Sequence, residues 1–198
     1  MINIAVFISG RGSNFKAINE AIKSGFIKNA KISIVISDNP DAYGLTYARQ
    51  HEIPYEIINN PEKNVRENNI LNILHENSIA LICLAGYMKI ISSKIIDKYC
   101  NKIMNIHPSL LPSFPGVNAQ KQALDYGVKI TGCTLHFVDV YVDNGPIILQ
   151  RAVEINEEDS VNSLSERILQ YEHEIYPLGI KLFVENRLFI SGRKVFIK

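Results

Sequence analysis

The stretch INIAVFISGRGSN (residues 2–14) decides how this chain folds. Its first half, Ile2 to Ile8, is almost continuously apolar, which is typical of a strand buried on both faces of a sheet. A turn with two glycines follows, and the next segment, FKAINEAIKSG, carries apolar residues at helical spacing before it stops at Gly25. A buried strand followed at once by an amphipathic helix indicates a parallel sheet whose strands are connected by helices.

The same alternation continues through the first half of the chain. Short runs rich in β-branched residues predict further strands at residues 31–37, 55–58, 79–86 and 102–107. Helical patterns separate several of these runs, at residues 41–52 and 61–78. This order predicts a parallel sheet with helices on both faces.

The second half of the chain has a different order. Residues 129–138 and 146–155 read as consecutive strands with a short connection, so we expect them to form an antiparallel or mixed extension of the sheet. An amphipathic helix is predicted from about Ser160 to Asn186, with a kink or a restart at Pro177. The remaining tail is expected to form a small hairpin around Ser191–Gly192.

These patterns together predict one α/β domain over residues 1–198, because no linker-like stretch divides the chain. The expected architecture is a Rossmann-like, mostly parallel sheet with helices on both faces. The antiparallel extension of this sheet belongs to the C-terminal half.

Composition limits the classes of partner. The chain is 46% hydrophobic with a formal net charge of +1, so nothing favours a polyanion such as nucleic acid. No apolar run approaches the roughly 20 residues that cross a bilayer, and the start lacks signal-peptide features, so we expect a cytoplasmic protein. Cys83, Cys100 and Cys133 are widely spaced, which favours reduced, mostly buried thiols. The histidines lack a surrounding carboxylate cluster, so no metal site is expected.

Three polar segments follow predicted strands directly. They are Gly10 to Asn14, Gly86 to Ile91, and Asn105 to Gly116. In open parallel sheets, ligands bind beyond the carboxyl ends of the strands, so we expect these segments to contribute to one site.

The first of these segments, SGRGSN, has two readings. Free backbone N–H groups at a strand-to-helix turn could hold a phosphate at Gly12, Ser13 and Asn14. The segment is neither a Walker loop nor a full G-x-G-x-x-G, since Phe15 stands where the last glycine belongs. The alternative is a tight turn in which Ser13 or Asn14 caps the helix.

The segment NIHPSLLPSFPG (residues 105–116) carries the most chemistry. Asn105 and His107 are two residues apart in an extended strand, so their side chains should face the same space. An amide donor and an imidazole could polarise a carbonyl and move a proton. Prolines at 108, 112 and 115 would hold that geometry, with the isomer of the Leu111–Pro112 bond left open. The alternative is a strand-end Asn with a His that satisfies loop carbonyls.

A further polar segment, VDNGP (residues 142–146), is first of all a turn signal. Asp143 could also be the carboxylate that orients His107 and raises its basicity. His136, by contrast, lies in a predicted strand and is interpreted as a hydrogen-bonded core residue rather than a ligand.

Five motifs together closely resemble the phosphoribosylglycinamide formyltransferase family of folate-dependent enzymes. They are ISGRGSN, LAGYMKI, NIHPSLLPSFPG, DNGPIILQ and EHEIYPL. The resemblance runs from Ile2 to about Leu188, in the family's order and spacing. It implies transfer of a formyl group from 10-formyltetrahydrofolate to the amino group of glycinamide ribonucleotide, in purine biosynthesis and without a metal.

The resemblance also implies roles for particular residues. Asn105, His107 and Asp143 match the catalytic trio, in which Asn105 and a protonated His107 face the formyl oxygen and Asp143 accepts a proton through water. The residues matching the ribonucleotide site are Gly12, Ser13, Asn14 and Glu172. Those matching the folate pocket are Arg66, Met88, Lys89, Ile90, Ile91 and Asp139, together with Asn105 and Asp143.

Three positions depart from the family pattern. Arg11 stands where many members carry Asn, and it adds positive charge beside the proposed phosphate site. Lys89 stands where Arg is usual, although its backbone can still serve the pterin ring. Asn118 replaces a common His, which could change substrate affinity or rate.

Three rival functions were weighed against this one. A methionyl-tRNA formyltransferase needs a further domain and a basic surface, whereas this sequence ends at Lys198 and is nearly neutral. A non-catalytic nucleotide- or folate-binding module need not keep the trio. A dinucleotide-binding domain would need the third glycine and an acidic residue after the second strand, where Ser37–Asp38 is ambiguous. We therefore expect small-molecule substrates and a monomer or homodimer.

Overall fold

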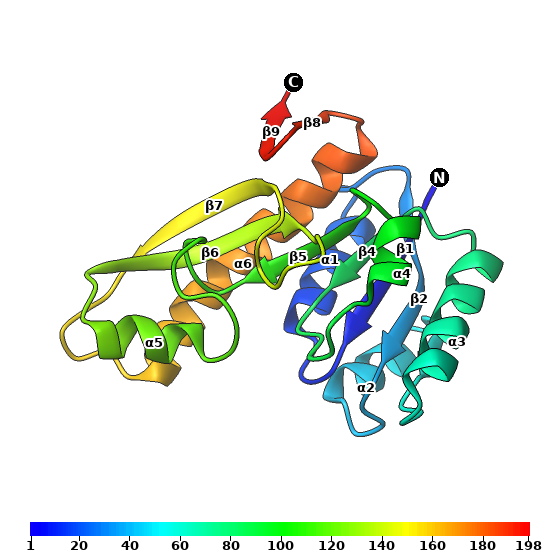
Figure 1. Ribbon diagram of the computed structural model, residues 1–198, viewed down its shortest axis with the longest axis horizontal. Coiled ribbons are helices and arrows are strands. Elements are labelled where there is room, and N and C mark those ends of the chain that lie inside the picture. Colours follow the sequence, from blue (N-terminus) through cyan, green and yellow to red (C-terminus); the bar gives the residue numbers. More distant parts are fainter. The chain divides into compact units, whose positions relative to one another are not determined.

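The computed structural model describes residues 1–198 and contains nine strands and six helices. The chain divides into two compact units, residues 1–104 and 105–198, and each is described by itself (Figure 1). The expectation of a single domain over the whole chain stays a prediction.

The first unit is built on a parallel sheet. Its strands are β1 (Ile2–Ile8), β2 (Ala30–Ser37), β3 (Tyr55–Ile57) and β4 (Leu81–Leu84), in the order β3-β2-β1-β4. All three pairings between these strands are parallel. β1 lies at the centre, and its residues from Ile4 to Ile8 are fully buried, as the continuous apolar run predicts.

Four helices connect and cover these strands. They are α1 (Ser13–Lys23), α2 (Tyr43–Gln50), α3 (Lys63–Glu76) and α4 (Ser93–Lys98). The chain moves outward from β1 to β3 and then returns to β4, so right-handed crossovers place α1 and α2 on one face and α3 on the other. In agreement, α1 contacts α2 and α3 contacts α4 (Figure 1).

The second unit contains the antiparallel part of the fold. The unit begins within β5 (Ile103–His107), at Asn105. β6 (Ile130–Phe137) pairs antiparallel with β7 (Ile147–Glu154). β8 (Leu188–Ser191) and β9 (Lys194–Ile197) form the C-terminal hairpin, and β9 also pairs with β7.

Two helices belong to the second unit. α5 (Ala119–Tyr126) packs against α6 (Val161–Val184), which also contacts β6 and β7. Ser160 caps α6 by accepting a hydrogen bond from the backbone N–H of Ser163 at 3.1 Å.

The structure confirms the predicted α/β class, with parallel strands in the first half and an antiparallel extension in the second. Helices α4 and α5, of 6 and 8 residues, were not predicted. α6 runs through Pro177 without a restart, because Tyr176 and Ile180 beside it are fully buried in the core. The Leu111–Pro112 bond is cis.

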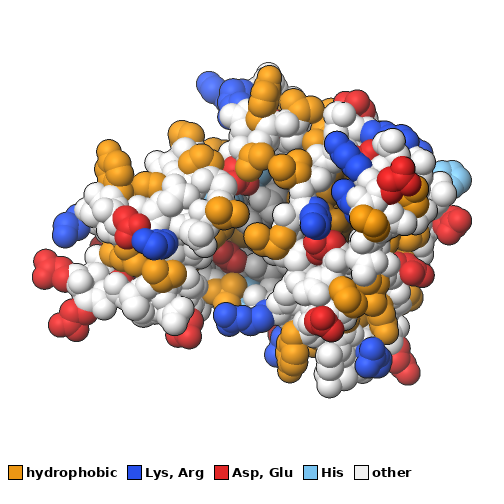
Figure 2. All heavy atoms as spheres, turned by 60° about the horizontal axis from the view of Figure 1, so that its bottom comes forward, with side chains coloured by type: hydrophobic (Ala, Val, Ile, Leu, Met, Phe, Trp, Pro, Cys, Tyr) orange, Lys and Arg blue, Asp and Glu red, His pale blue; other side chains and the backbone are white.

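The surface and the helices bear on the predicted partners. Figure 2 shows basic and acidic side chains interspersed over one face, with no extended patch of a single sign. No helix has both the length and the apolar character needed to cross a membrane. Cys83 and Cys133 are buried as expected, whereas Cys100 is exposed.

Candidate active site

In the second unit, the structure brings together the three residues of the predicted trio. Asn105 and His107 lie on β5, and Asp143 lies in the loop between β6 and β7. The Nδ1 atom of His107 is 3.2 Å from Oδ2 of Asp143, and Nδ2 of Asn105 is 3.5 Å from Oδ1 of the same carboxylate. The side chains of His107 and Asp143 are only 6% and 11% exposed, so this ion pair is shielded from water.

Both ring nitrogens of His107 are occupied. Nε2 lies 2.8 Å from the carbonyl oxygen of Phe114, which can only accept, so Nε2 must carry a proton. Nδ1 faces an Asp143 oxygen, which also only accepts when it is ionised. The geometry therefore fits a doubly protonated, positively charged His107 beside an ionised Asp143.

His136 is a buried, hydrogen-bonded residue, as predicted, and it also lies against the trio, which was not predicted. Its Nδ1 lies 2.8 Å from the carbonyl oxygen of Phe137, so Nδ1 carries the proton and Nε2 is left as an acceptor. Nε2 then accepts a hydrogen bond from Nδ2 of Asn105 at 3.2 Å. Burial lowers the pKa of His136, so this histidine is held neutral.

The loop that carries Asp143 is fixed by backbone contacts. Asp143 has a positive φ of 50°, and its Oδ2 accepts a hydrogen bond from the N–H of Gly116 at 2.7 Å. Gly145 must be glycine, since a Cβ there would lie 1.8 Å from the carbonyl oxygen of Phe137. The predicted folate residue Asp139 holds the loop from within, by accepting from the backbone N–H of Tyr141 at 2.9 Å.

In the first unit, the predicted phosphate turn lies at the start of α1. Gly12 is the N-cap with a left-handed φ of 73°, and no side chain caps the helix, so the alternative of a cap by Ser13 or Asn14 is wrong. The first backbone N–H groups of a helix lack intrahelical partners, which leaves this turn suited to an anion. Asn14 is buried at 7% exposure, whereas Ser13 is partly open to solvent.

A close approach of two backbones shapes this turn. A Cβ added at Gly12 would lie 2.9 Å from the Cα of Gly44, at the start of α2. The N–H of Gly44 donates to the carbonyl oxygen of Gly10 at 3.1 Å. Gly44 was not predicted as a site residue, because only the fold brings α2 against the turn.

The other predicted residues of the first unit lie after β4 and on α3. Met88, Lys89 and Ile90 are exposed and Ile91 is buried, so the segment presents two apolar side chains to solvent. Arg66 is half-buried on α3 and donates from Nη1 to the carbonyl oxygen of Asn60 at 2.8 Å. The folate role of these residues stays a prediction.

Glu172 lies on α6 in the second unit and is 7% exposed. Burial, followed by the charge of Glu172, raises the pKa of the Cys133 thiol to about 12. Cys133 is therefore a protonated thiol at neutral pH and not a nucleophile.

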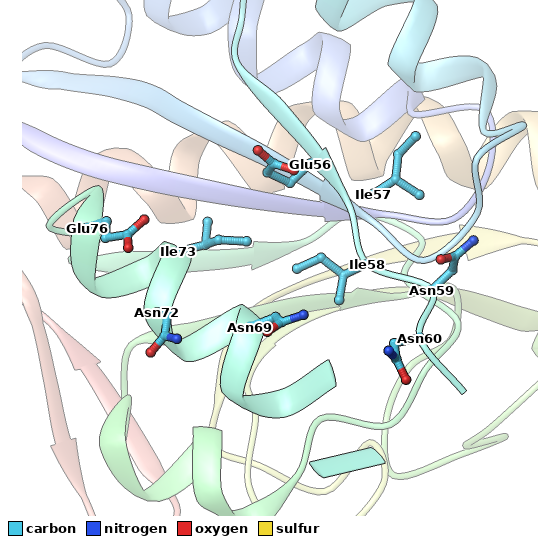
Figure 3. Close-up of a pocket in the computed structure, with 9 residues that line it drawn as sticks. All are labelled: Glu56, Ile57, Ile58, Asn59, Asn60, Asn69, Asn72, Ile73 and Glu76. Atoms are coloured by element: carbon cyan, nitrogen blue, oxygen red, sulfur yellow. The ribbon is translucent and has the colours of Figure 1, made fainter. Parts of the chain in front are cut away.

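A separate pocket of the first unit, with a volume of about 310 Å³, lies beside β3 and α3 (Figure 3). Its walls carry the carboxylates of Glu56 and Glu76 and four asparagine side chains. None of the predicted site residues lines it. The chemistry of the cluster around His107 therefore has no counterpart there.

Comparison with known proteins shows the family of this chain. The sequence pattern of the formyl transferase family matches residues 2–180. The chain belongs to the formyl transferase family. The match includes all predicted site residues of both units and ends before the C-terminal hairpin.

Two relatives and one solved structure illustrate this membership. The chain is 42% identical to the phosphoribosylglycinamide formyltransferase of Haemophilus influenzae, over 100% of this chain and 94% of the relative. It is 44% identical to the human trifunctional purine biosynthetic protein adenosine-3, over 98% of this chain but only 20% of that protein. The crystal structure of glycinamide ribonucleotide transformylase 1 from Symbiobacterium toebii matches with a TM-score of 0.96 and 46% identity, over 100% and 94% of the two chains.

Proposed function

We propose that this formyl transferase moves the formyl group of 10-formyltetrahydrofolate to the amino group of glycinamide ribonucleotide. The observation that carries the proposal is the shielded cluster of Asn105, His107 and Asp143 in a chain of this family. The amine attacks the formyl carbon, a bond to N10 of the folate breaks, and the products are formylglycinamide ribonucleotide and tetrahydrofolate. The amine must lose a proton, and N10 must gain one.

Asn105 is the residue that we assign to the formyl oxygen. One N–H of its amide is held by His136 at 3.2 Å. The other faces Asp143 at 3.5 Å, which is long for a hydrogen bond and easily exchanged for a stronger acceptor. A preorganised donor at a developing oxyanion lowers the barrier by about 3 kcal/mol.

His107 acts through its charge. Because Nε2 is engaged by Phe114 and Nδ1 by Asp143, a direct hydrogen bond to the formyl oxygen would require His107 to release one of them. We therefore assign His107 to holding Asp143 ionised and to placing a positive charge near the oxyanion. Asp143 accepts the proton of the attacking amine through a water molecule.

The remaining residues are assigned to binding. Gly12, Ser13, Asn14 and Glu172 bind the ribonucleotide. The folate is bound by Arg66, Met88, Lys89, Ile90, Ile91 and Asp139, with contributions from Asn105 and Asp143. The exposed Met88 and Ile90 suit a flat heteroaromatic ring.

We also propose that the protein works in the cytoplasm on small molecules, as a monomer or homodimer. The net charge of +1 and the mixed charges on the face in Figure 2 support small-molecule substrates rather than nucleic acid.

A formyl-transfer assay tests the proposal. Purified protein is mixed with glycinamide ribonucleotide and 10-formyltetrahydrofolate, and the formylated product is measured by mass spectrometry alongside tetrahydrofolate. We expect equal amounts of the two products. Omission of the ribonucleotide measures hydrolysis of the folate, and formate with ATP replaces the folate as the control donor. A folded protein that yields no formylated ribonucleotide would contradict the proposal.

A further inference from the structure

Every polar group of Ser9, the residue after β1, is engaged within the first unit. Its N–H donates to the carbonyl oxygen of Gly86 at 3.2 Å, and its carbonyl oxygen accepts from Nδ2 of Asn39 at 3.0 Å. Its Oγ donates to Oδ1 of Asp38 at 2.5 Å and accepts from the backbone N–H of Met88 at 2.8 Å. One small side chain therefore connects the ends of β1, β2 and β4.

Asp38 directs the Ser9 hydroxyl. A hydroxyl has one proton, and its donation to the carboxylate turns the lone pairs of Oγ toward the N–H of Met88. Without the carboxylate, the hydroxyl is free to rotate and the hydrogen bond to Met88 weakens. In a dinucleotide-binding domain, an acidic residue at this strand end would bind a ribose. Here the carboxylate of Asp38 accepts a hydrogen bond from Ser9 instead.

The chain between these contacts is anchored by Tyr87. Its ring packs edge-on against Phe7 of β1, with centroids 5.2 Å apart. Burial raises the pKa of Tyr87 to about 12, and the charge of Asp38 contributes to the rise. The carboxylate of Asp38 is thus close enough to Tyr87 for its charge to act on the phenol.

We propose that Ser9 and Asp38 are positioning residues that set the Met88–Ile91 segment for the folate ring. The inference rests on the proposed function, since it takes this segment to bind folate. The bonds to Gly86 and Met88 fix the start of the segment, whose backbone groups must meet the ring at hydrogen-bond distance. Neither Ser9 nor Asp38 needs to touch a substrate for this role.

The test is the dissociation constant for tetrahydrofolate, measured by calorimetry on the full chain. We expect Ser9→Ala and Asp38→Ala each to weaken binding about 5- to 10-fold, as for loss of one ordered hydrogen bond. The double variant should bind no more weakly than either single variant, because both changes remove the same constraint. Asp38→Asn, whose amide oxygen can still accept from Ser9, should recover most of the affinity.

A matched control is Ser24→Ala, which removes an exposed serine hydroxyl that donates to Ala21 in the same unit. It should bind tetrahydrofolate like wild type. Under saturating substrates, kcat of Ser9→Ala and Asp38→Ala should stay within about twofold of wild type, so that the defect lies in folate affinity.

Other results would overturn the inference. Unchanged affinity in folded Ser9→Ala or Asp38→Ala would do so, as would an equal loss in kcat and in affinity for both substrates, which indicates a general structural defect. Failure of wild type to bind tetrahydrofolate would instead remove the proposed function, and this inference with it.

Discussion

The Nδ1 atom of His107 lies 3.2 Å from Oδ2 of Asp143, and the loop that follows His107 holds both partners of this pair. The carbonyl oxygen of Phe114 accepts from His107 at 2.8 Å, and the N–H of Gly116 donates to Asp143 at 2.7 Å. Pro115 separates these two backbone groups and restricts the chain between them. The proline-rich loop thus places one hydrogen-bond acceptor beside His107 and one donor beside Asp143. The prolines restrict the loop so that both groups stay in position.

Replacement of Asn105 tests the oxyanion donor. Asn105→Ala should lower kcat about 10²- to 10³-fold, because the amide N–H that we assign to the formyl oxygen is lost. The KM for glycinamide ribonucleotide should change little, since the lost interaction forms mainly in the transition state. Steady-state formyl-transfer kinetics measure both.

The matched control for this variant is Asn68→Ala on α3, where an exposed asparagine accepts a hydrogen bond from Lys94. It should keep wild-type kinetics. A folded Asn105→Ala enzyme with near-normal kcat would take Asn105 out of the reaction.

His136 predicts a pH dependence of stability. Burial lowers its pKa in the folded chain, so below the ordinary histidine value of about 6.5 the unfolded chain binds a proton that the folded chain does not. The free energy of unfolding is therefore unaffected by this group above that pH. It falls below that pH by up to about 1.4 kcal/mol per pH unit. His136→Gln should show a correspondingly shallower loss in urea unfolding between neutral and acidic pH.

The comparison variant is His75→Gln, at an exposed histidine of α3. It should show the same dependence on pH as wild type. Equal slopes for His136→Gln and wild type would mean that His136 is not held neutral by the fold.

Gly44 is not a predicted site residue, but we expect its replacement to weaken binding of the ribonucleotide. A Cβ there would lie 2.7 Å from Cδ1 of Ile8 and 3.3 Å from the Cα of Gly12, so the end of the Ile8 side chain must shift and the backbone at Gly12 must give by a few tenths of an ångström. Gly44→Ala should raise the KM for glycinamide ribonucleotide about tenfold, because displacement of binding groups is costly. The KM for 10-formyltetrahydrofolate should stay near the wild-type value.

Tyr43→Ala serves as the control at the same end of α2, since this side chain is 70% exposed. It should leave both KM values unchanged. A Gly44→Ala enzyme whose two KM values rise equally would show that the close approach to Gly12 does not act on the ribonucleotide site specifically.

Local patterns predicted much of the fold. The apolar run of β1 and the two-residue spacing of Asn105 and His107 depend on periodicity within one strand, which sequence displays directly. For Asp143, the residues alone allowed either a turn or the carboxylate that orients His107, and the family resemblance favoured the second.

The features that were not predicted depend on tertiary contacts. His136 joins the cluster only because the fold brings β6 against Asn105 and the loop that carries Asp143. The pattern of residues within β6 does not indicate these neighbours. Gly44 matters through a backbone approach from another helix. Asp38 was ambiguous as the acidic residue of a dinucleotide-binding domain, and the structure pairs it with Ser9, which is 29 residues away. In each case, the deciding neighbour is distant in sequence.

The most direct test of the account is the single-turnover rate of formyl transfer by Asp143→Asn, with both substrates saturating. The amide keeps an acceptor for the N–H of Gly116 but cannot stay ionised beside His107 or take the proton of the amine. We predict an enzyme that keeps its fold and whose rate is lower by about 100-fold or more. A folded Asp143→Asn enzyme that transfers the formyl group at close to the wild-type rate would contradict the account.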